Sequence, residues 1–246
     1  MTDVTAVVSD EELLKVTANQ PSYEGKSKRV WAAGPGYCVV RLIPSLSSFT
    51  FQREALFAET GRLRLDFYEM AAERLQSAGI ETVFVRRLGD ICYLARNCPS
   101  PPFETIVKNF AVGSTIRKYP GLFQEGEALR WPIVKFDYRC EPEDQPIGED
   151  YLRLLGHPVD EWRHLALETN RILKNWLAPR RLIDFCIIIG KDENGRSVLN
   201  SEVSPDGMRL QSSEGASLDK DLFRAGATES EIVQVWQRLV SSLGAR

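Results

Sequence analysis

The stretch that most constrains the fold of this chain runs from Leu182 to Leu210 and reads LIDFCIIIGKDENGRSVLNSEVSPDGMRL. Its apolar runs flank a polar turn, a pattern typical of two antiparallel strands joined as a hairpin. Four charged residues, Asp184, Glu202, Asp206 and Arg209, stand near the ends of these strands. The stretch therefore predicts a β-hairpin that carries a small polar cluster at its ends.

Further short apolar runs, separated by glycine-containing turns, fill the first half of the chain. Runs at Arg29–Ala32 and Tyr37–Ile43 predict one hairpin, and residues 81–96 predict a second. Residues 105–114 and 131–138 are rich in β-branched and aromatic side chains and predict two more strands. The first half is therefore expected to be mostly sheet.

Three segments have helical spacing of their apolar residues instead. One begins at Arg62 and ends before Gly79, a second covers residues 159–176, and a third follows a capping box formed by Thr228 and Glu231. Strands and helices do not alternate regularly, so the predicted class is α+β.

The length of 246 residues, 43% of them hydrophobic, suits one large domain or two small, closely packed ones. A polar, proline-containing segment at residues 139–148 marks the expected boundary. We predict a leader at residues 1–22, a β-rich lobe at 23–138 and an α+β lobe at 139–246.

Charge and hydropathy exclude several partners. The net charge is −3 and both signs are scattered along the chain, so there is no basic stripe for nucleic acid or for an anionic membrane. No apolar stretch approaches the roughly 18 residues of a membrane span. We expect a cytoplasmic protein with small-molecule partners, and homo-oligomerisation stays open.

The cysteines and histidines indicate no site of their own. The five cysteines are an odd set without C-x-x-C spacing, which argues against a disulfide framework and a zinc ribbon and favours a reducing compartment. Cys186 alternates within an apolar strand and is expected to be a packed small side chain. His157 and His164 lack a nucleophile motif nearby, so we interpret both as structural or surface residues.

Three short motifs have the composition of anion sites. YEGKSKR places Gly25 beside Lys26 and Lys28, and VKNFAVGSTIRK combines Lys108 with Ser114 in a glycine turn. In SLDKDLFRAG, Lys220 and Arg224 share a face if the segment is helical. Taken alone, each motif is more typical of a solvated basic turn, strand end or helix face than of an anion site.

Taken in order, six segments resemble the SAICAR synthetase (phosphoribosylaminoimidazole-succinocarboxamide synthase) family. They are YEGKSKRV, FETIVKNFAVGS, PIVKFDYR, LIDFCIIIG, SEVSPDGMRL and SLDKDLFR, which extend over residues 23–224. The resemblance implies a two-lobed α+β fold with antiparallel sheets and a nucleotide-binding cleft between the lobes. It also implies an enzyme that uses ATP and Mg²⁺ to activate a carboxylate on an imidazole ribonucleotide, which an amine such as aspartate then attacks.

The resemblance assigns roles to residues. Gly25, Lys26 and Lys28 match its phosphate-holding loop for ATP. The positions that hold the ribonucleotide phosphate and the substrate carboxylates are matched by Ser114, Arg209, Lys220 and Arg224, with Lys108 standing where the family has arginine. Asp184, Glu202 and Asp206 are the candidate catalytic residues, and Glu202 is the candidate metal ligand.

The same resemblance shows departures around the opening stretch. Cys186 stands in place of a family lysine, and Ile188 and Ser201 stand in place of the Glu and Asp that are the principal magnesium ligands. Mg²⁺ prefers hard oxygen ligands, of which Ile188 offers none. Further departures from polar or acidic family residues are Thr50, Lys135 and Gln145.

Three hypotheses follow. The first is an ATP-dependent amide-forming ligase acting on a carboxylated aminoimidazole-type ribonucleotide, in a purine-related or specialised nucleoside pathway. The second is an ATP-independent hydrolase, lyase or isomerase acting on a phosphoribosyl-type anion, with Asp184, Glu202 or Asp206 as acid or base. The third is a non-catalytic protein that binds such a metabolite.

Overall fold

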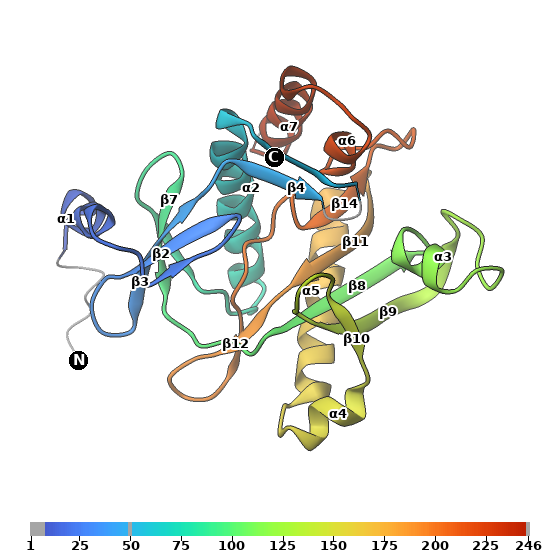
Figure 1. Cartoon of the computed structure of the whole chain (residues 1–246), viewed down its shortest axis with the longest axis horizontal. Helices are drawn as coiled ribbons and strands as arrows, with labels where there is room; N and C mark the ends of the chain where they lie inside the picture. The colour runs from blue at the N-terminus through green and yellow to red at the C-terminus, as the bar shows by residue number, and fades with distance from the viewer. Residues whose placement is uncertain (1–7, 49–50, 245–246) are drawn as a thin grey trace.

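The computed structural model describes residues 8–48 and 51–244 and contains two five-stranded antiparallel sheets that lie side by side (Figure 1). The first sheet has the order β1-β2-β3-β7-β6. Its strands are β1 (Tyr23–Glu24), β2 (Lys28–Ala32), β3 (Tyr37–Leu42), β6 (Phe84–Arg87) and β7 (Cys92–Arg96). Both hairpins predicted for this part of the chain, β2 with β3 and β6 with β7, are confirmed.

The second sheet has the order β10-β9-β8-β11-β14. Its strands are β8 (Phe103–Phe110), β9 (Ala128–Tyr138), β10 (Gln145–Ile147), β11 (Arg181–Ile187) and β14 (Met208–Gln211). The chain therefore changes sheet between β7 and β8, earlier than the predicted boundary at residues 138 and 139, which would separate the paired strands β9 and β10. Side-chain polarity indicated the strands but could not show which strands pair.

The hairpin predicted for residues 182–210 is divided in two. Its outer parts, β11 and β14, pair within the second sheet, whereas its inner parts, β12 (Ile189–Lys191) and β13 (Ser197–Leu199), form a separate two-stranded sheet. Residues 200–207 lie between β13 and β14 as an irregular segment. Of the predicted polar cluster, Glu202 and Asp206 therefore lie at this interruption, whereas Asp184 and Arg209 lie opposite each other within β11 and β14.

The long helices occupy the segments with helical spacing. They are α2 (Ala58–Ser77), α5 (Val159–Leu177) and α7 (Glu229–Gly244). α2 begins one turn earlier than predicted, and Gly79 follows its end with a φ of 85°, a backbone conformation that favours glycine. The predicted capping box is confirmed, because the Glu231 carboxylate accepts hydrogen bonds from the backbone N–H and the hydroxyl of Thr228.

The shorter elements complete the described chain. They are α1 (Asp10–Lys15), η2 (Val16–Ala18), the paired strands β4 (Ser45–Ser48) and β5 (Arg53–Leu56), α3 (Ser114–Lys118), α4 (Glu149–Leu154) and α6 (Asp221–Arg224). Part of the predicted leader is thus helical, with Ser9 capping α1. Within the described ranges, no helix is long and apolar enough to cross a membrane.

One core joins the two sheets through α2 and α5. The Phe67 ring of α2 lies 5.1 Å from that of Trp176 of α5, and Phe67 is fully buried. Burial of one such side chain contributes about 1.5–3 kcal/mol to stability. α5 also holds the second sheet through a buried amide pair, Asn109 with Asn170. One face of this sheet is therefore covered by α5, which leaves the other face for a site.

Candidate functional site

A cavity of about 990 Å³ lies between the two sheets. Among the residues the structure describes, eight cationic side chains and five carboxylates line it. The cations are Lys28, Arg64, Arg96, Lys108, Arg139, Arg209, Lys220 and Arg224, and the carboxylates are Glu104, Asp144, Asp184, Glu202 and Asp206. In a chain of net charge −3, cations thus outnumber carboxylates in this lining by three, although Glu81 and Asp221 pair with some of these cations from outside the lining.

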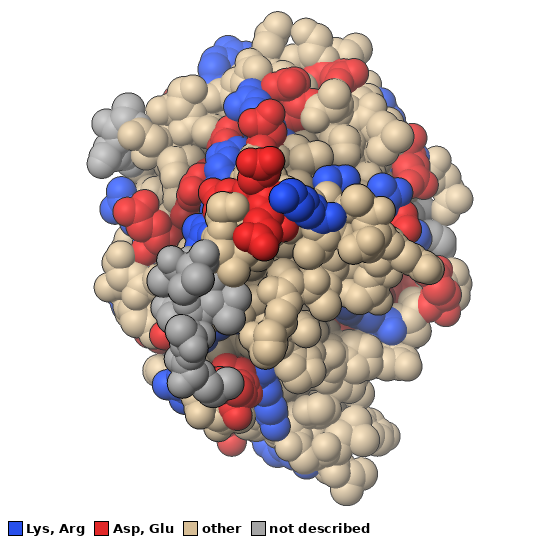
Figure 2. Space-filling view, turned by 90° about the vertical axis from the view of Figure 1, so that its left-hand side faces the viewer, with Lys and Arg blue, Asp and Glu red and all other residues tan. Residues whose placement is uncertain are grey.

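The structure brings together most of the residues proposed from the sequence. The cavity lining includes Lys28, Lys108, Ser114, Asp184, Glu202, Asp206, Arg209, Lys220 and Arg224. Gly25 and Lys26 are not among the lining residues. Outside the cavity the two signs of charge are mixed. On the face shown in Figure 2, basic and acidic side chains of the described residues lie among one another.

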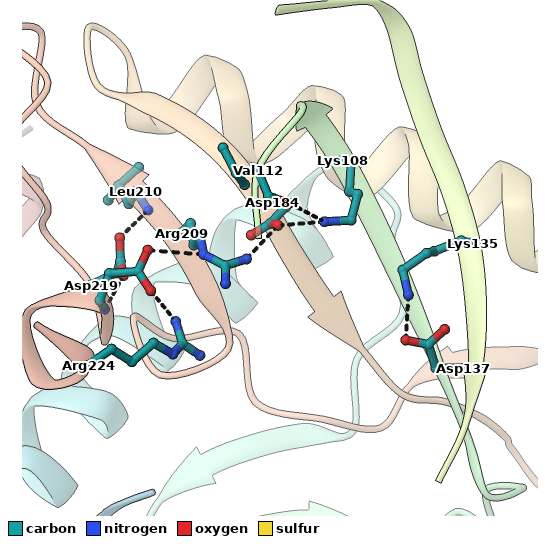
Figure 3. Close-up of polar contacts among 10 residues, drawn as sticks. Lys108, Val112, Lys135, Asp137, Asp184, Arg209, Leu210, Asp219 and Arg224 are labelled. Carbon is teal, nitrogen blue, oxygen red and sulfur yellow. Dashed lines mark hydrogen bonds and ion pairs between the residues drawn. The ribbon is translucent and has the colours of Figure 1, made fainter. Parts of the chain in front are cut away.

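A chain of ion pairs lies at one end of the cavity, and we call its members, Lys108, Asp184, Arg209, Asp221 and Arg224, the anion cradle. All of them except Asp221 line the cavity and are labelled in Figure 3. Asp184 Oδ2 lies 3.2 Å from Lys108 Nζ and 2.8 Å from Arg209 Nη1. Arg209 Nε lies 3.0 Å from Asp221 Oδ2, and Asp221 pairs in turn with Arg224. These contacts hold the cationic heads in place before any ligand arrives.

Strand pairing explains how the anion cradle forms. On β11, Asp184 is opposite Lys108 of β8 on one side and Arg209 of β14 on the other. Burial lowers the pKa of the Lys108 ammonium, while Asp184 acts in the opposite direction. Burial acts to lower the pKa of Arg209 as well, but Asp184 and Asp221 raise it overall. Three adjacent strands thus place opposite charges at one level of the sheet.

Ser114 reaches the anion cradle through a glycine turn. It begins α3 after Gly113, whose φ of 58° and ψ of −117° are unfavourable for other residues. A Cβ on Gly113 would lie 3.0 Å from Arg209 Nη2. The backbone of this turn therefore packs directly against the Arg209 guanidinium, which explains why glycine is needed here.

Lys220 and Asp206 extend the charged end of the cavity. Lys220 Nζ lies 2.8 Å from Asp206 Oδ1, and Lys220 is the N-cap residue of the short helix α6. Burial acts to raise the pKa of Asp206, but Lys220 and Arg64 outweigh it and lower that pKa below its ordinary value. Asp206 is therefore an ionised counter-ion. The sequence predicted that Lys220 and Arg224 share a face only if their segment is helical. The segment does form a helix, α6, which is one turn long and begins after Lys220.

Glu202 is held by an arginine that sequence reasoning missed. Arg64 of α2 is 1% exposed, and its Nε and Nη2 lie 2.7 and 2.8 Å from the two carboxylate oxygens of Glu202. The Ser204 hydroxyl also donates to Glu202 over 2.7 Å. Arg64 stands between Leu63 and Leu65 on the broad buried face of α2, and a charge at such a position was the signal that could have revealed it.

Next to the anion cradle lies an uncharged part of the cavity, Cys186, Ile188 and Ser201, which we call the neutral wall. Cys186 follows Asp184 on the same face of β11, and the Ser201 hydroxyl accepts a hydrogen bond of 2.9 Å from the Ile188 N–H. Burial, with Glu104 next, raises the pKa of the Cys186 thiol well above its ordinary value. Cys186 is therefore a neutral thiol facing the cavity, where the sequence predicted a packed side chain.

The neutral wall does not fit a protein-bound magnesium ion. Within residues 8–48 and 51–244, no group of three or more His, Cys, Asp or Glu side chains is placed to hold a metal. Glu202, the candidate metal ligand, has both oxygens on Arg64, and Asp206 is paired with Lys220. Ser201 offers one neutral oxygen that already accepts a backbone N–H, so the hard oxygen ligands that Mg²⁺ requires are missing.

Glu104 is a second cavity residue that the sequence analysis did not identify. It lies on β8, and no ion pair with it is found among the described residues. Burial, then Asp144 and Asp137, raises the pKa of Glu104, although the Cys186 thiol and Arg139 oppose this. The alternation Glu104, Ile106, Lys108 along β8 was the available signal, because these side chains share one face.

The predicted phosphate loop is only partly directed at the cavity. Lys28 lines it, and burial lowers the pKa of Lys28, with Glu202 acting in the opposite direction. Gly25 closes a backbone turn by donating to the Lys28 carbonyl over 2.9 Å. The Lys26 side chain is 74% exposed, and its ammonium lies 3.9 Å from Glu141. Lys28 is thus the member of this loop that the fold places at the site.

The remaining departures lie at the margin of the site. Lys135 pairs with Asp137 on β9, away from the anion cradle in Figure 3, and Gln145 begins β10. Thr50 lies outside the described residues. His157 stacks on Trp162 at 5.0 Å and His164 is exposed, so both are structural or surface residues, as predicted.

Comparison with known proteins gives one consistent result. Residues 21–240 match the SAICAR synthetase family. The phosphoribosylaminoimidazole-succinocarboxamide synthase of Methanocaldococcus jannaschii is 32% identical over 87% of this chain and 90% of its own. That of Streptococcus sanguinis is 31% identical over 90% of this chain and 98% of its own.

Solved structures agree. A SAICAR synthetase in complex with ADP superimposes with a TM-score of 0.85 at 28% identity, covering 91% of this chain and 97% of the other. The SAICAR synthetase of Pyrococcus horikoshii gives a TM-score of 0.82 at 26% identity, covering 89% and 98%. The α+β class with antiparallel sheets is thereby confirmed.

Proposed function

This chain belongs to the SAICAR synthetase family of carbon–nitrogen ligases, and we propose that it joins an amine to a carboxylated aminoimidazole-type ribonucleotide at the expense of ATP. The reaction would belong to purine-related or specialised nucleoside metabolism, with an aspartate-like amine as acceptor. The ADP complex of a relative supports the use of a nucleotide by analogy.

The observation that carries this proposal is the anion cradle. Arg209 presents a planar fork of donors beside Lys108, Arg224 and the Ser114 turn, and such a fork matches the geometry of phosphate and carboxylate. The partners of these cations are carboxylates of the chain itself. A ligand phosphate can therefore bind to cations that are already ordered, which lowers the entropic cost of binding.

The chemistry requires activation because oxide is a poor leaving group. In the proposed reaction a carboxylate oxygen of the ribonucleotide attacks the γ-phosphorus of ATP, the bond from that phosphorus to the β,γ-bridging oxygen breaks, and ADP leaves. The amine nitrogen then attacks the acyl carbon, phosphate departs with the bonding electrons, and the amine loses a proton to solvent. Fixed cations such as Lys28 and Arg209 lower the energy of the crowded negative charge.

A turnover assay tests the proposal directly. The protein is incubated with 5-aminoimidazole-4-carboxylate ribonucleotide, ATP, magnesium chloride and a panel of amines that includes aspartate. Mass spectrometry detects the amide, and chromatography quantifies ADP. We expect ADP to form only when both the ribonucleotide and a suitable amine are present. Arg171→Ala, an exposed change on α5, serves as the matched control and should retain full turnover.

The neutral wall favours a second candidate, ATP-independent chemistry on the same class of phosphoribosyl compound. Ile188 and Ser201 are neutral residues in the part of the cavity where the family resemblance places acidic metal ligands. Consumption of the ribonucleotide without ATP, with no dependence on an amine, would support this candidate and refute the ligase. If the ribonucleotide is consumed under neither condition, both candidates fail.

A further inference from the structure

We propose that the cavity binds its ribonucleotide without a divalent metal ion held by protein ligands, through its excess of fixed positive charge. This inference rests on the proposed function, because it takes a ribonucleotide that has one phosphate and one carboxylate as the ligand. It adds that any magnesium in the reaction arrives on the phosphates of ATP.

The charge of the cavity is opposite in sign to that of such a ligand. Eight cationic side chains and five carboxylates among the described residues line it, and Glu81 and Asp221 pair with three of these cations from outside the lining, so a smaller positive excess remains. A phosphate monoester carries close to two negative charges at neutral pH, and a carboxylate adds one. Such a ligand is therefore attracted by the fixed cations of the lining themselves, without a metal ion held by protein ligands.

Three of the carboxylates near the neutral wall are already engaged, and the fourth, Glu104, lies beside the Cys186 thiol and belongs to no metal-holding group among the described residues. Asp184 lies between Lys108 and Arg209, and Glu202 has both oxygens on Arg64. Asp206 is paired with Lys220. A metal could recruit one of these groups only by separating a largely buried ion pair, which leaves a buried cation without a partner.

The neutral wall itself offers no replacement. Ile188 is partly exposed to the cavity and has no side-chain donor or acceptor, and the Ser201 hydroxyl accepts the Ile188 N–H. Magnesium in proteins keeps several waters that need acceptors around them. An isoleucine at this point provides none, so this part of the cavity disfavours both the ion and its water shell.

Calorimetric titration of 5-aminoimidazole-4-carboxylate ribonucleotide into the full chain tests the inference. One series contains EDTA and the other contains excess magnesium chloride at matched ionic strength, because salt screens charge. We expect the two dissociation constants to agree within about twofold, since no protein-bound ion takes part. A tenfold or larger tightening by magnesium would overturn the inference.

The double variant Ile188→Glu/Ser201→Asp provides the stronger comparison. It adds two negative charges to the lining, so binding in EDTA should weaken by at least about tenfold. Magnesium should then restore much of the affinity, which gives the variant the metal dependence that the natural chain lacks. The matched control Ile188→Gln/Ser201→Asn changes size and polarity but not charge, and should remain independent of magnesium. Equal behaviour of the two double variants would contradict the inference.

The two proposals fail in distinguishable ways. Tight binding in EDTA without turnover refutes the ligase and leaves metal-free binding supported. Turnover with binding that requires magnesium supports the ligase and refutes metal-free binding. If the ribonucleotide binds in neither series, metal-free binding is refuted, and a titration of ATP then shows whether the cavity retains a nucleotide site.

Discussion

The anion cradle and the neutral wall are neighbours on the same sheet face but have opposite chemistry. Asp184 and Cys186 are two residues apart on β11 and face the same cavity. Around Asp184 every charge has an opposite partner, whereas Cys186, Ile188 and Ser201 have no charge at all. The chain maintains costly buried ion pairs at one position and no ionised group at the next. This contrast supports the proposal that the cavity holds an anion without a protein-bound metal ion.

Removing the central counter-ion should break the anion cradle with the largest effect. Asp184→Asn leaves Lys108, which is 3% exposed, and Arg209 without their shared carboxylate. We expect the free energy of unfolding, measured by urea denaturation, to fall by about 3–5 kcal/mol. The matched change in the neutral wall, Cys186→Ala, should cost only about 1 kcal/mol. Equal losses would show that the two regions do not differ as described.

Arg209→Lys tests whether binding of the ribonucleotide to the anion cradle needs the planar guanidinium or only its positive charge. Lysine keeps the charge but cannot contact Asp184 and Asp221 through a rigid fork. We expect the affinity for the ribonucleotide, measured by calorimetry, to fall by about 10- to 100-fold, equivalent to about 1.4–2.8 kcal/mol. Arg171→Lys, at an exposed pair on α5, is the control and should have no effect. Unchanged affinity of the Arg209 variant would show that the fork is dispensable.

Gly113→Ala tests the backbone that supports Arg209. Alanine is strained at a φ of 58° and a ψ of −117°, which should cost about 1–3 kcal/mol of unfolding free energy. Its Cβ would also press on the guanidinium and weaken ribonucleotide binding. Gly121→Ala, at a φ of 81° with open space around it, gives backbone strain without the contact. If both variants bind the ribonucleotide equally well, Gly113 does not position Arg209.

The pH dependence of stability should have opposite signs for Asp206, at the charged end of the cavity, and for Glu104, beside the neutral wall. The pKa of Asp206 is lowered, so its stabilising contribution is present above the pKa of the unfolded chain and is lost as pH falls through the folded value. The pKa of Glu104, beside the neutral wall, is raised, so the folded chain binds the extra proton and stability falls as pH rises between the two values.

Neutral variants of the two carboxylates measure the sign of each contribution to the slope of unfolding free energy against pH. Asp206→Asn should reduce the rise of unfolding free energy with pH, and Glu104→Gln should reduce its fall. Each difference is limited to about 1.4 kcal/mol per pH unit, because one proton is involved. Urea denaturation at several pH values gives both slopes. Slopes that change in the same direction would contradict the electrostatic contrast.

Most of the fold and much of the site could be predicted because local signals carried them. Glycine turns indicated the hairpins of the first sheet, and the Thr228 capping box indicated the start of α7. The motifs named most of the cavity cations, since charged residues in glycine-rich turns and strand ends are visible in sequence. The pairing partners were not visible, because an ion pair such as Arg64 with Glu202 joins residues 138 positions apart.

The sequence by itself determined the α+β class and the amphipathic helices, because composition and periodicity act locally. The family resemblance added that Ile188 and Ser201 are neutral residues at positions where the family has acidic ones. Only the tertiary structure decided that β8 and β9 join the second sheet and that each candidate catalytic carboxylate is a counter-ion. Strand order and desolvation depend on contacts between distant segments. A carboxylate in solvent titrates near its ordinary pKa and is mobile, whereas the same group beside a buried cation is held in place as an ionised partner.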